Sequence, residues 1–280
     1  MQQRSKHRFA NLPRGGENPL QYAVTQRDKT TILMVREAVE HKQTLMAYQP
    51  VIRDVTSKSI AFYEGLIRLL DATGRVIPAR DFMPIVETTQ LGREIDVLSL
   101  RAGMMALQHN PNLRVSINMS ARSIGFGAWT SMMNRWLARD PTIGERLILE
   151  MSEQSAMLMP ELVADFINRM QDQGVCFALD NFGSGYTAIR YFKELYFDIL
   201  KIDGQFTRGI SKNAENRALI TVMVSIAENF DMVTVAEQVE NEDDSEALRQ
   251  LGVDCQQGYL FGGPTTRPYW AINPEAEKSG

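Results

Sequence analysis

Short apolar runs alternate with helical patterns along most of the chain. Apolar residues at helical spacing predict a helix over Thr30–Glu40. Strand-like runs follow at Leu45–Val51 and Ile60–Leu70, with turn residues at Asp54–Lys58 between them. Because so short a connection permits a hairpin but no crossover helix, we expect these two strands to be antiparallel.

The remainder of the chain repeats the alternation of strand and helix. Asp81 is the expected N-cap of a helix that runs to about Gln108. Further helices are predicted at Trp129–Leu137, Met159–Gln173, Ile189–Leu195, Glu215–Asn229 and Asp243–Leu251. Further strands are predicted at Val115–Asn118, in the runs ending at Glu150, Asp180, Ile202 and Glu237, and at Gly258–Phe261. Eight strand candidates with intervening helices predict an α/β fold, a modified TIM (β/α)8 barrel with an antiparallel first strand.

Composition limits the classes of function. The chain has 280 residues, 44% of them hydrophobic and 23% charged, which fits one large barrel or two small domains. The formal net charge of −4 argues against binding to a nucleic-acid polymer, which requires a concentrated basic surface. We find no apolar run of about 18 residues and no signal-peptide pattern, so we expect a cytoplasmic protein without a membrane span.

The two ends of the chain differ from its middle. Residues 1–27 are polar, with Arg4, Lys6, Arg8 and Arg14 against the single acid Glu17, and we expect a flexible basic arm. Dispersed charges of this kind favour a solvated segment over a binding element. Residues 28–268 form the expected domain, and residues 269–280 a C-terminal tail.

Carboxylates and an amide end several strand-like runs: Glu64, Asn118, Glu150, Asp180 and Glu237. Any one of these alone would favour a salt bridge or a helix cap. Together, at the carboxyl ends of barrel strands, they indicate a site at the mouth of the barrel. Hard oxygen donors without a histidine suit Mg²⁺ or Mn²⁺ rather than zinc. Considered without any family resemblance, a barrel with such acids could also be an enolase-type enzyme that abstracts a proton with a lysine base and Mg²⁺.

Eight ordered motifs resemble the EAL domain of cyclic di-GMP phosphodiesterases. They are Tyr48-Gln49-Pro50-Val51, Glu64-Gly65-Leu66-Ile67-Arg68, Asn118-Met119-Ser120, Glu150-Met151-Ser152-Glu153, Asp180-Asn181-Phe182-Gly183, Lys201-Ile202-Asp203, Ala236-Glu237-Gln238-Val239-Glu240 and Gln257-Gly258-Tyr259. The resemblance implies cleavage of cyclic di-GMP to linear pGpG at a site with divalent cations.

The resemblance also implies roles for individual residues. The implied metal ligands are Glu64, Asn118, Glu150, Asp180, Asn181 and Glu237. The implied catalytic residues are Lys201, Glu237 and Glu64, and the implied ligand contacts are Gln49, Arg68, Glu240 and Gln257. Glu153 would stabilise the loop after the strand that ends near Asp180. From the residues alone, Lys201 could instead form a salt bridge to barrel carboxylates, and Gln257 could satisfy buried backbone groups.

Four positions depart from the family pattern. Asn181 stands where active members have a second Asp, Gly65 replaces Ala, Gln238 replaces Gly, and Ser152 replaces Thr, which is a mild change. An Asn carbonyl can bind a hard cation but lacks the negative charge, so we expect one Mg²⁺ or Mn²⁺ site and a weakened second site. A side chain at position 238 would crowd the site if the backbone there had positive φ.

The expected activity is therefore a cyclic di-GMP phosphodiesterase weakened by Asn181. The alternative is a catalytically inactive receptor that binds the same nucleotide and acts through a protein partner. By resemblance, a homodimer is also expected.

Overall fold

The computed structural model describes residues 19–185 and 189–272. In this part of the chain, eight strands close into a barrel in the order β1-β9-β8-β7-β6-β5-β4-β2, and β3 pairs with β2 outside the ring. The strands are β1 Thr44–Asp54, β2 Ser59–Leu70, β3 Val76–Pro78, β4 Val115–Asn118, β5 Leu147–Ser152, β6 Cys176–Phe182, β7 Ile199–Ile202, β8 Val233–Ala236 and β9 Cys255–Gln256. The predicted α/β barrel is confirmed.

The first strand runs against both of its neighbours. β1 pairs antiparallel with β2 and with β9, whereas the pairs from β2–β4 round to β8–β9 are parallel. The β1–β2 hairpin places Gln49 opposite Glu64. The predicted antiparallel start is therefore confirmed, and it brings both residues to the same height in the barrel wall.

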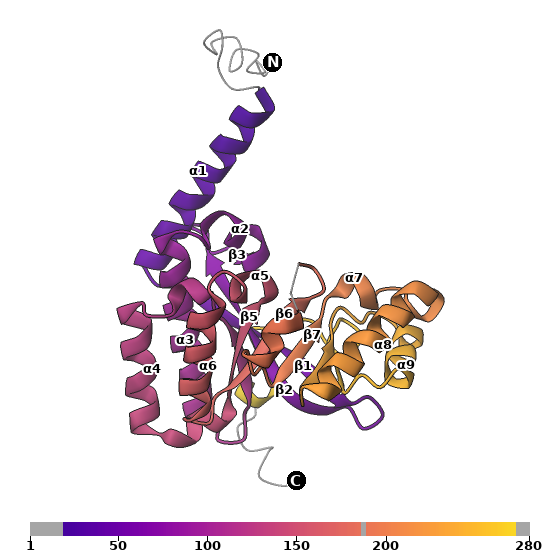
Figure 1. Ribbon diagram of the computed structural model, residues 1–280. Helices are drawn as coiled ribbons and strands as arrows, with labels where there is room; N and C mark the ends of the chain where they lie inside the picture. The colour runs from indigo at the N-terminus through magenta and orange to yellow at the C-terminus, as the bar shows by residue number, and fades with distance from the viewer. Residues whose placement is uncertain (1–18, 186–188, 273–280) are drawn as a thin grey trace.

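Helices surround the ring of strands (Figure 1). The longer ones are α1 Pro19–Glu40, α3 Gln90–His109, α4 Gly127–Arg139, α6 Pro160–Gln171, α8 Ala214–Asn229 and α9 Glu242–Gln250. Short helical turns are α2 Met83–Val86, α5 Glu153–Ala156, α7 Gly204–Thr207, α10 Tyr269–Ile272 and the 3₁₀ segments η1 Ala79–Asp81, η2 Ala121–Ser123, η3 Pro141–Arg146, η4 Ile189–Lys193 and η5 Ile210–Lys212. No described helix meets the length and hydrophobicity that crossing a membrane requires.

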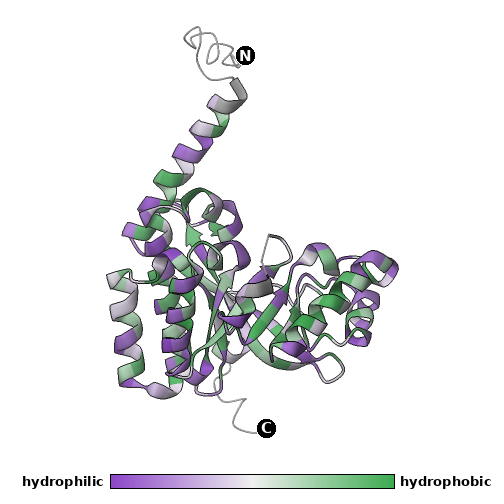
Figure 2. Ribbon diagram, viewed as in Figure 1, coloured by the Kyte–Doolittle hydropathy of each residue, from purple (hydrophilic) through white to green (hydrophobic). Residues whose placement is uncertain are grey.

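The strands carry hydrophobic residues on both faces, because helices cover the outside and the barrel interior is itself packed. Green, apolar residues are frequent along the strands, whereas the helices carry bands of both purple and green (Figure 2). One interior cluster takes a residue from each of seven strands. Its members are Val51, Phe62, Ile148, Ala178, Ile199, Val235 and Cys255. This cluster closes the barrel below the polar residues described in the next section.

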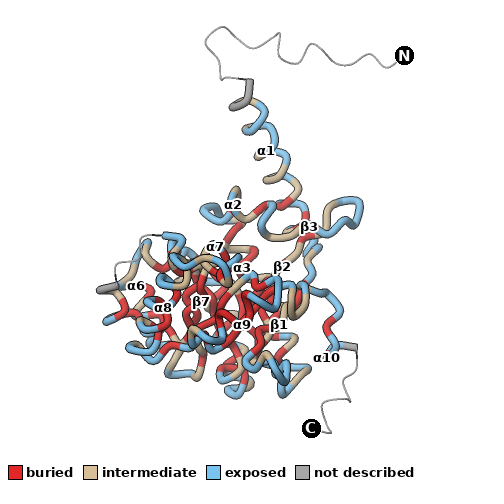
Figure 3. Tube along the Cα trace, turned by 90° about the vertical axis from the view of Figure 1, so that its right-hand side faces the viewer, coloured by how far each residue is buried: buried red, intermediate tan, exposed pale blue. Residues whose placement is uncertain are grey.

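The helix expected at Thr30–Glu40 begins earlier, at Pro19. Residues 19–27, which were assigned to the flexible arm, therefore belong to α1, while residues 1–18 lie outside the described part of the chain. Only the C-terminal part of α1 packs on the domain, where Val35 and Ala38 join a cluster with Leu69. Figures 1 and 3 show the other end projecting away from the barrel.

The prediction that Asp81 caps a long helix was wrong. Asp81 lies in η1, and α3 begins only after Thr89, whose side chain accepts a hydrogen bond from the Leu91 amide. The backbone of Thr89 is extended, with ψ of 178°, so it interrupts the helical path that the apolar spacing indicated. A Thr in extended conformation is a good N-cap because its hydroxyl replaces a missing helical acceptor.

The predicted last strand, Gly258–Phe261, was also wrong: β9 is Cys255–Gln256. The Gly258 carbonyl accepts from the amides of Phe261 and Gly262, so the backbone there forms a turn rather than a sheet ladder. A Cβ at Gly258 would lie 2.0 Å from the Val239 carbonyl oxygen, so this close approach requires glycine.

Part of the expected C-terminal tail is ordered against the barrel. Trp270 in α10 is 5% exposed and makes edge contacts with the rings of Tyr48 and Tyr63, at centroid distances of 4.9 and 6.0 Å. Residues 273–280 of that tail lie outside the described residues.

Candidate active site

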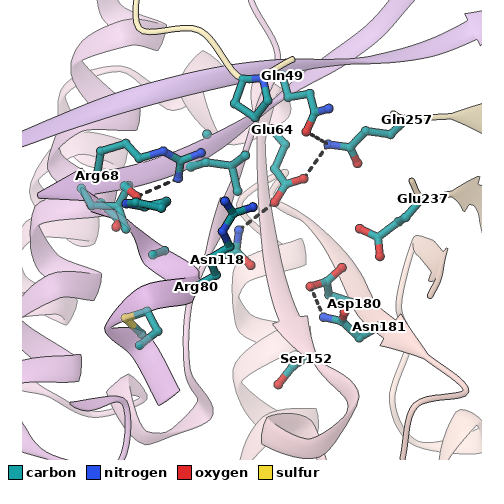
Figure 4. Close-up of a pocket in the computed structure, with 18 of the residues that line it drawn as sticks. Gln49, Glu64, Arg68, Arg80, Asn118, Ser152, Asp180, Asn181, Glu237 and Gln257 are labelled. Carbon is teal, nitrogen blue, oxygen red and sulfur yellow. Dashed lines mark hydrogen bonds between the residues drawn. The ribbon is translucent and has the colours of Figure 1, made fainter. Parts of the chain in front are cut away.

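A layer of polar side chains lies directly above the apolar cluster in the barrel. Successive side chains of a strand point to opposite faces, so the residue two positions beyond each apolar one faces the interior again. In this way Phe62 is followed by Glu64, and Ile199 by Lys201. The layer consists of Gln49, Glu64, Asn118, Glu150, Asp180, Lys201, Glu237 and Gln257. Figure 4 labels its members other than Glu150 and Lys201.

Lys201 lies at the centre of this layer and is completely buried. Its Nζ is 2.8 Å from Oε2 of Glu150 and 3.1 Å from Oε2 of Glu64. It is also 3.1 Å from Oε1 of Glu237 and 3.2 Å from Oδ1 of Asp180. One ammonium therefore contacts four carboxylates, three of them on strands β2, β5 and β6 and one, Glu237, directly after β8. The salt bridge expected as an alternative role for Lys201 is present, and it does not exclude a role in catalysis.

Two amides hold Glu64 in place. Asn118 Nδ2 donates to Oε1 of Glu64 at 3.0 Å, and Gln257 Nε2 donates to Oε2 at 2.6 Å. Gln49 contacts Gln257 at 3.4 Å and donates from Nε2 to the Gly262 carbonyl at 3.0 Å. Gln257 thus contacts a site carboxylate rather than a backbone group, in contrast to the alternative that the sequence allowed.

The charges in this layer do not balance. Burial, together with neighbouring Glu64, raises the pKa of Glu150 to about 8, and burial raises that of Glu237 well above its usual range. Although burial opposes it, the Lys201 ammonium and the hydrogen bonds from Gln257 and Asn118 hold the pKa of Glu64 below its usual value. Burial thus favours the protonated forms of Glu150 and Glu237, and further positive charge in the layer would favour their charged forms instead.

This shortage of positive charge fits a divalent cation. Three buried acceptors of the layer have no hydrogen-bond partner: Oε1 of Glu150, Oδ1 of Asp180 and Oε1 of Gln257. The surrounding donors are carboxylate and amide oxygens, which hard cations prefer. In the described ranges, however, no three Asp, Glu, His or Cys side chains are already arranged to hold a metal ion. The carboxylates contact the Lys201 ammonium instead, so a metal ion would compete with that ammonium for the same oxygens.

Two of the departures from the family pattern lie in unusual backbone conformations. Asn181 has φ of 56° and Gln238 has φ of 57°, both in the left-handed region. The condition under which Gln238 would crowd the site is therefore met, and its side chain lies against Gly204, where a Cβ would be 2.2 Å from the Gln238 Cδ. Asn181 Nδ2 donates to Oδ2 of Asp180 at 2.5 Å. In this conformation the amide nitrogen, not the oxygen, faces the Asp180 carboxylate.

Glu153 reaches the loop after β6 as the resemblance implied. Its Oε2 accepts from the amides of Gly183 and Gly185, at 2.9 and 3.1 Å. Glu153 is 2% exposed, so water does not replace these two donors. Residues 186–188 of the loop lie outside the described residues. The loop-stabilising role stays a prediction supported by these two contacts.

The polar layer forms one end of a pocket of about 850 Å³. Arg68 and Glu240 line it, and their role as ligand contacts stays a prediction. Arg68 Nη1 donates to the carbonyl of the neighbouring Ile67. Sequence reasoning missed Arg80 and Arg208, which also line the pocket. Both lie in segments that connect the longer elements, where no hydrophobic periodicity indicates which way an arginine side chain points.

An aromatic side chain at the pocket was missed as well. Tyr259 lines it and is 65% exposed. Its position directly after Gln257 and Gly258, in a motif already noted, was the signal that could have identified it. An exposed ring beside arginines offers a surface on which a base could stack.

The chain is similar to proteins of cyclic nucleotide signalling. It is 29% identical over 259 residues to the cyclic di-GMP phosphodiesterase PdeF of Escherichia coli (strain K12), covering 91% of this chain and 34% of that protein. It is 29% identical over 238 residues to the cyclic di-GMP phosphodiesterase PdeB of Shewanella oneidensis, covering 82% of this chain and 27% of that protein. The chain thus spans about a third or less of the length of these two relatives.

Solved structures share the fold. The PaMucR phosphodiesterase in its c-di-GMP complex superposes with a TM-score of 0.74 and 26% identity, covering 87% of this chain and 99% of that one. The FimX EAL domain of Xanthomonas citri, in complex with c-diGMP, has a TM-score of 0.76 at 22% identity, with 87% and 96% covered. The family expected from the motifs is confirmed. The EAL domain family model matches residues 33–264, and the chain belongs to the EAL domain family.

Proposed function

We propose that this chain binds cyclic di-GMP and hydrolyses one of its phosphodiester bonds to give linear pGpG. The observation that carries the proposal is the layer of four carboxylates around Lys201 at the floor of a pocket lined by arginines. Similarity to PdeF, PdeB and the PaMucR complex supports the choice of nucleotide.

In the proposed reaction a water oxygen bonds to phosphorus while the P–O3′ bond breaks, and the O3′ oxygen leaves with a proton. Mg²⁺ or Mn²⁺, when bound, would activate this water and offset the phosphate charge. Glu64, Asn118, Glu150 and Asp180 are the residues that would hold the cation, and Glu237 with the Asn181 oxygen would contribute to a second, weaker site.

Other residues of the chain would bind and orient the nucleotide. The Arg68 guanidinium presents a planar fork that suits phosphate oxygens. Gln257 and Asn118 fix the orientation of Glu64. The Lys201 ammonium, at the centre of the layer, is placed to stabilise negative charge that develops on the phosphate. Gln49 and Glu240 would contact the nucleotide at the pocket rim.

A receptor that binds cyclic di-GMP without cleaving it is the second candidate. It is favoured by the hydrogen bond from Asn181 to Asp180, which turns an amide nitrogen toward an oxygen that the second cation would need. Such a receptor would signal through a protein partner, and it would use the same pocket.

The test measures nucleotide binding and turnover on one sample, with Mg²⁺ and then with Mn²⁺. Linear pGpG that is formed by the parent and lost in Glu64→Gln supports the phosphodiesterase. The matched control is Glu161→Gln in the first turn of α6, which should leave turnover unchanged. Tight binding without product would select the receptor, and absence of both binding and product would refute the proposal.

A further inference from the structure

The loop after β4, which follows Asn118, is held by side chains from two other elements. Asp96 reaches it from α3, and Ser155 reaches it from α5. Neither residue was identified from the sequence. Both line the same pocket as the acid layer.

Asp96 binds the loop at two points. Its Oδ2 accepts from the Ser120 amide at 3.0 Å and from the Ser123 hydroxyl at 2.5 Å. Asp96 is 4% exposed and Ser123 is fully buried, so water does not replace either contact. A buried acceptor with two donors fixes the segment that begins two residues after Asn118.

Ser155 binds the next residue of the same loop. Its Oγ accepts from the Ala121 amide at 2.8 Å and lies 3.4 Å from the Ser120 hydroxyl oxygen. The Ser155 amide in turn donates to Oγ of Ser152 at 3.2 Å, which caps α5. The position of α5 therefore determines where the loop after β4 can sit.

The same single-turn helix also holds the loop after β6. Glu153 lies two residues before Ser155 and accepts from the amides of Gly183 and Gly185. The loop after β6 follows Asp180 and Asn181, just as the loop after β4 follows Asn118. One short helix thus contacts both loops, through Ser155 on one and Glu153 on the other.

We propose that α5 couples these two loops, with Ser155 and Asp96 acting as positioning residues for Asn118. A displacement of the loop after β6 would pass through Glu153 and Ser155 to Ala121, and so to the orientation of the Asn118 amide on Glu64. The expected effect of these residues on cation binding rests on the proposed function. The coupling of the two loops through α5 does not depend on it.

The first test uses amide hydrogen exchange of the protein without added cation. Ser155→Ala removes the acceptor of the Ala121 amide, and we expect exchange there to accelerate by about tenfold. Glu153→Gln should accelerate exchange at Gly183 and Gly185 and, through α5, also at Ala121. Ser131→Ala, on α4, is the matched control and should change none of these amides. If Glu153→Gln leaves Ala121 unchanged, the coupling is refuted.

The second test measures Mn²⁺ affinity by calorimetry together with the melting temperature. Changes next to metal ligands reduce affinity by about 10- to 100-fold, and we expect Ser155→Ala and Asp96→Asn to fall in that range. A purely structural role would lower the melting temperature and leave the affinity within twofold of the parent, which would overturn the positioning role. Ser155→Cys, which keeps the side-chain size with a weaker acceptor, should give an intermediate affinity.

A combined variant separates coupling from two independent effects. If α5 transmits the position of one loop to the other, the losses of Mn²⁺ affinity in Ser155→Ala and Glu153→Gln will not add in the double variant. Additive losses would overturn the coupling. If the parent binds no Mn²⁺, the proposed cation site fails, while the exchange measurements still decide whether α5 couples the loops.

Discussion

The side-chain nitrogen of Asn181 donates a hydrogen bond to Oδ2 of Asp180 at 2.5 Å, while Oδ1 of the same carboxylate lies 3.2 Å from the Lys201 ammonium. Oδ2 of Asp180 therefore accepts a hydrogen bond, whereas Oδ1 has no hydrogen-bond partner and only the ion-pair contact with Lys201. An aspartate at position 181 would remove one donor and add one negative charge to the site.

Asn181→Asp should raise Mn²⁺ affinity and pGpG formation, because a carboxylate attracts a second cation more strongly than an amide does. We expect an increase of about 10-fold or more. Calorimetric titration with Mn²⁺ and product analysis would measure it. Asn134→Asp, on α4, adds the same charge elsewhere and should leave both unchanged. Equal affinity in Asn181→Asp and the parent would show that Asn181 does not limit cation binding.

Lys201→Met should destabilise the protein and abolish turnover. Removing one partner of a buried ion pair leaves uncompensated charge, which costs about 3–5 kcal/mol of the free energy of unfolding. The acids left behind are Glu64, Glu150, Asp180 and Glu237. Because the pKa values of Glu150 and Glu237 are raised, these two can hold protons, and we expect a loss within that range. Urea unfolding at pH 7.5 measures it, with the exposed Lys193→Met as control. An unchanged unfolding midpoint would contradict the central role of Lys201.

Gln238→Gly should stabilise the fold. A non-glycine residue in the left-handed region costs about 1–2 kcal/mol, and Gln238 has φ of 57°. We expect the free energy of unfolding to rise by about 1 kcal/mol, because glycine has no Cβ to strain. Lys58→Gly, in the β1–β2 turn with φ of 54°, should give a similar gain without affecting nucleotide binding. A loss of stability would mean that the contact of Gln238 with Gly204 outweighs the strain.

Asp96 should make stability depend on pH. Burial raises its pKa from 3.8 to about 7, so between these pH values the unfolded chain releases a proton that the folded chain keeps. The free energy of unfolding therefore falls as pH rises from about 4 to about 7, by about 1.4 kcal/mol per pH unit at most from this group.

Asp96→Asn should remove that part of the slope. Comparing urea unfolding of the variant and the parent from pH 4.5 to 7.5 isolates Asp96 from the other buried acids. Asp172→Asn, at the exposed C-terminal end of α6, is the matched control. The same slope in Asp96→Asn and the parent would mean that Asp96 is already ionised in the folded protein.

Most of the barrel could be predicted because each strand carries its own signal. The alternation that places Glu64 beyond Phe62 and Lys201 beyond Ile199 is a local property of each strand, and so is the short turn that makes β1 and β2 antiparallel. Element ends were less predictable. Thr89, not Asp81, caps α3. Apolar residues continue at helical spacing across this region, so their pattern does not show that the backbone of Thr89 is extended.

By itself, the sequence determined the family, the barrel and the acids, amides and lysine at the carboxyl ends of the strands, because strand alternation and motif order are encoded locally. Only the tertiary structure decided that four carboxylates converge on one ammonium and that Asn181 turns its nitrogen toward Asp180. It also decided that Asp96, Ser155, Arg80 and Arg208 belong to the same pocket. These relationships join residues distant in the chain, and their distances follow from how the barrel closes.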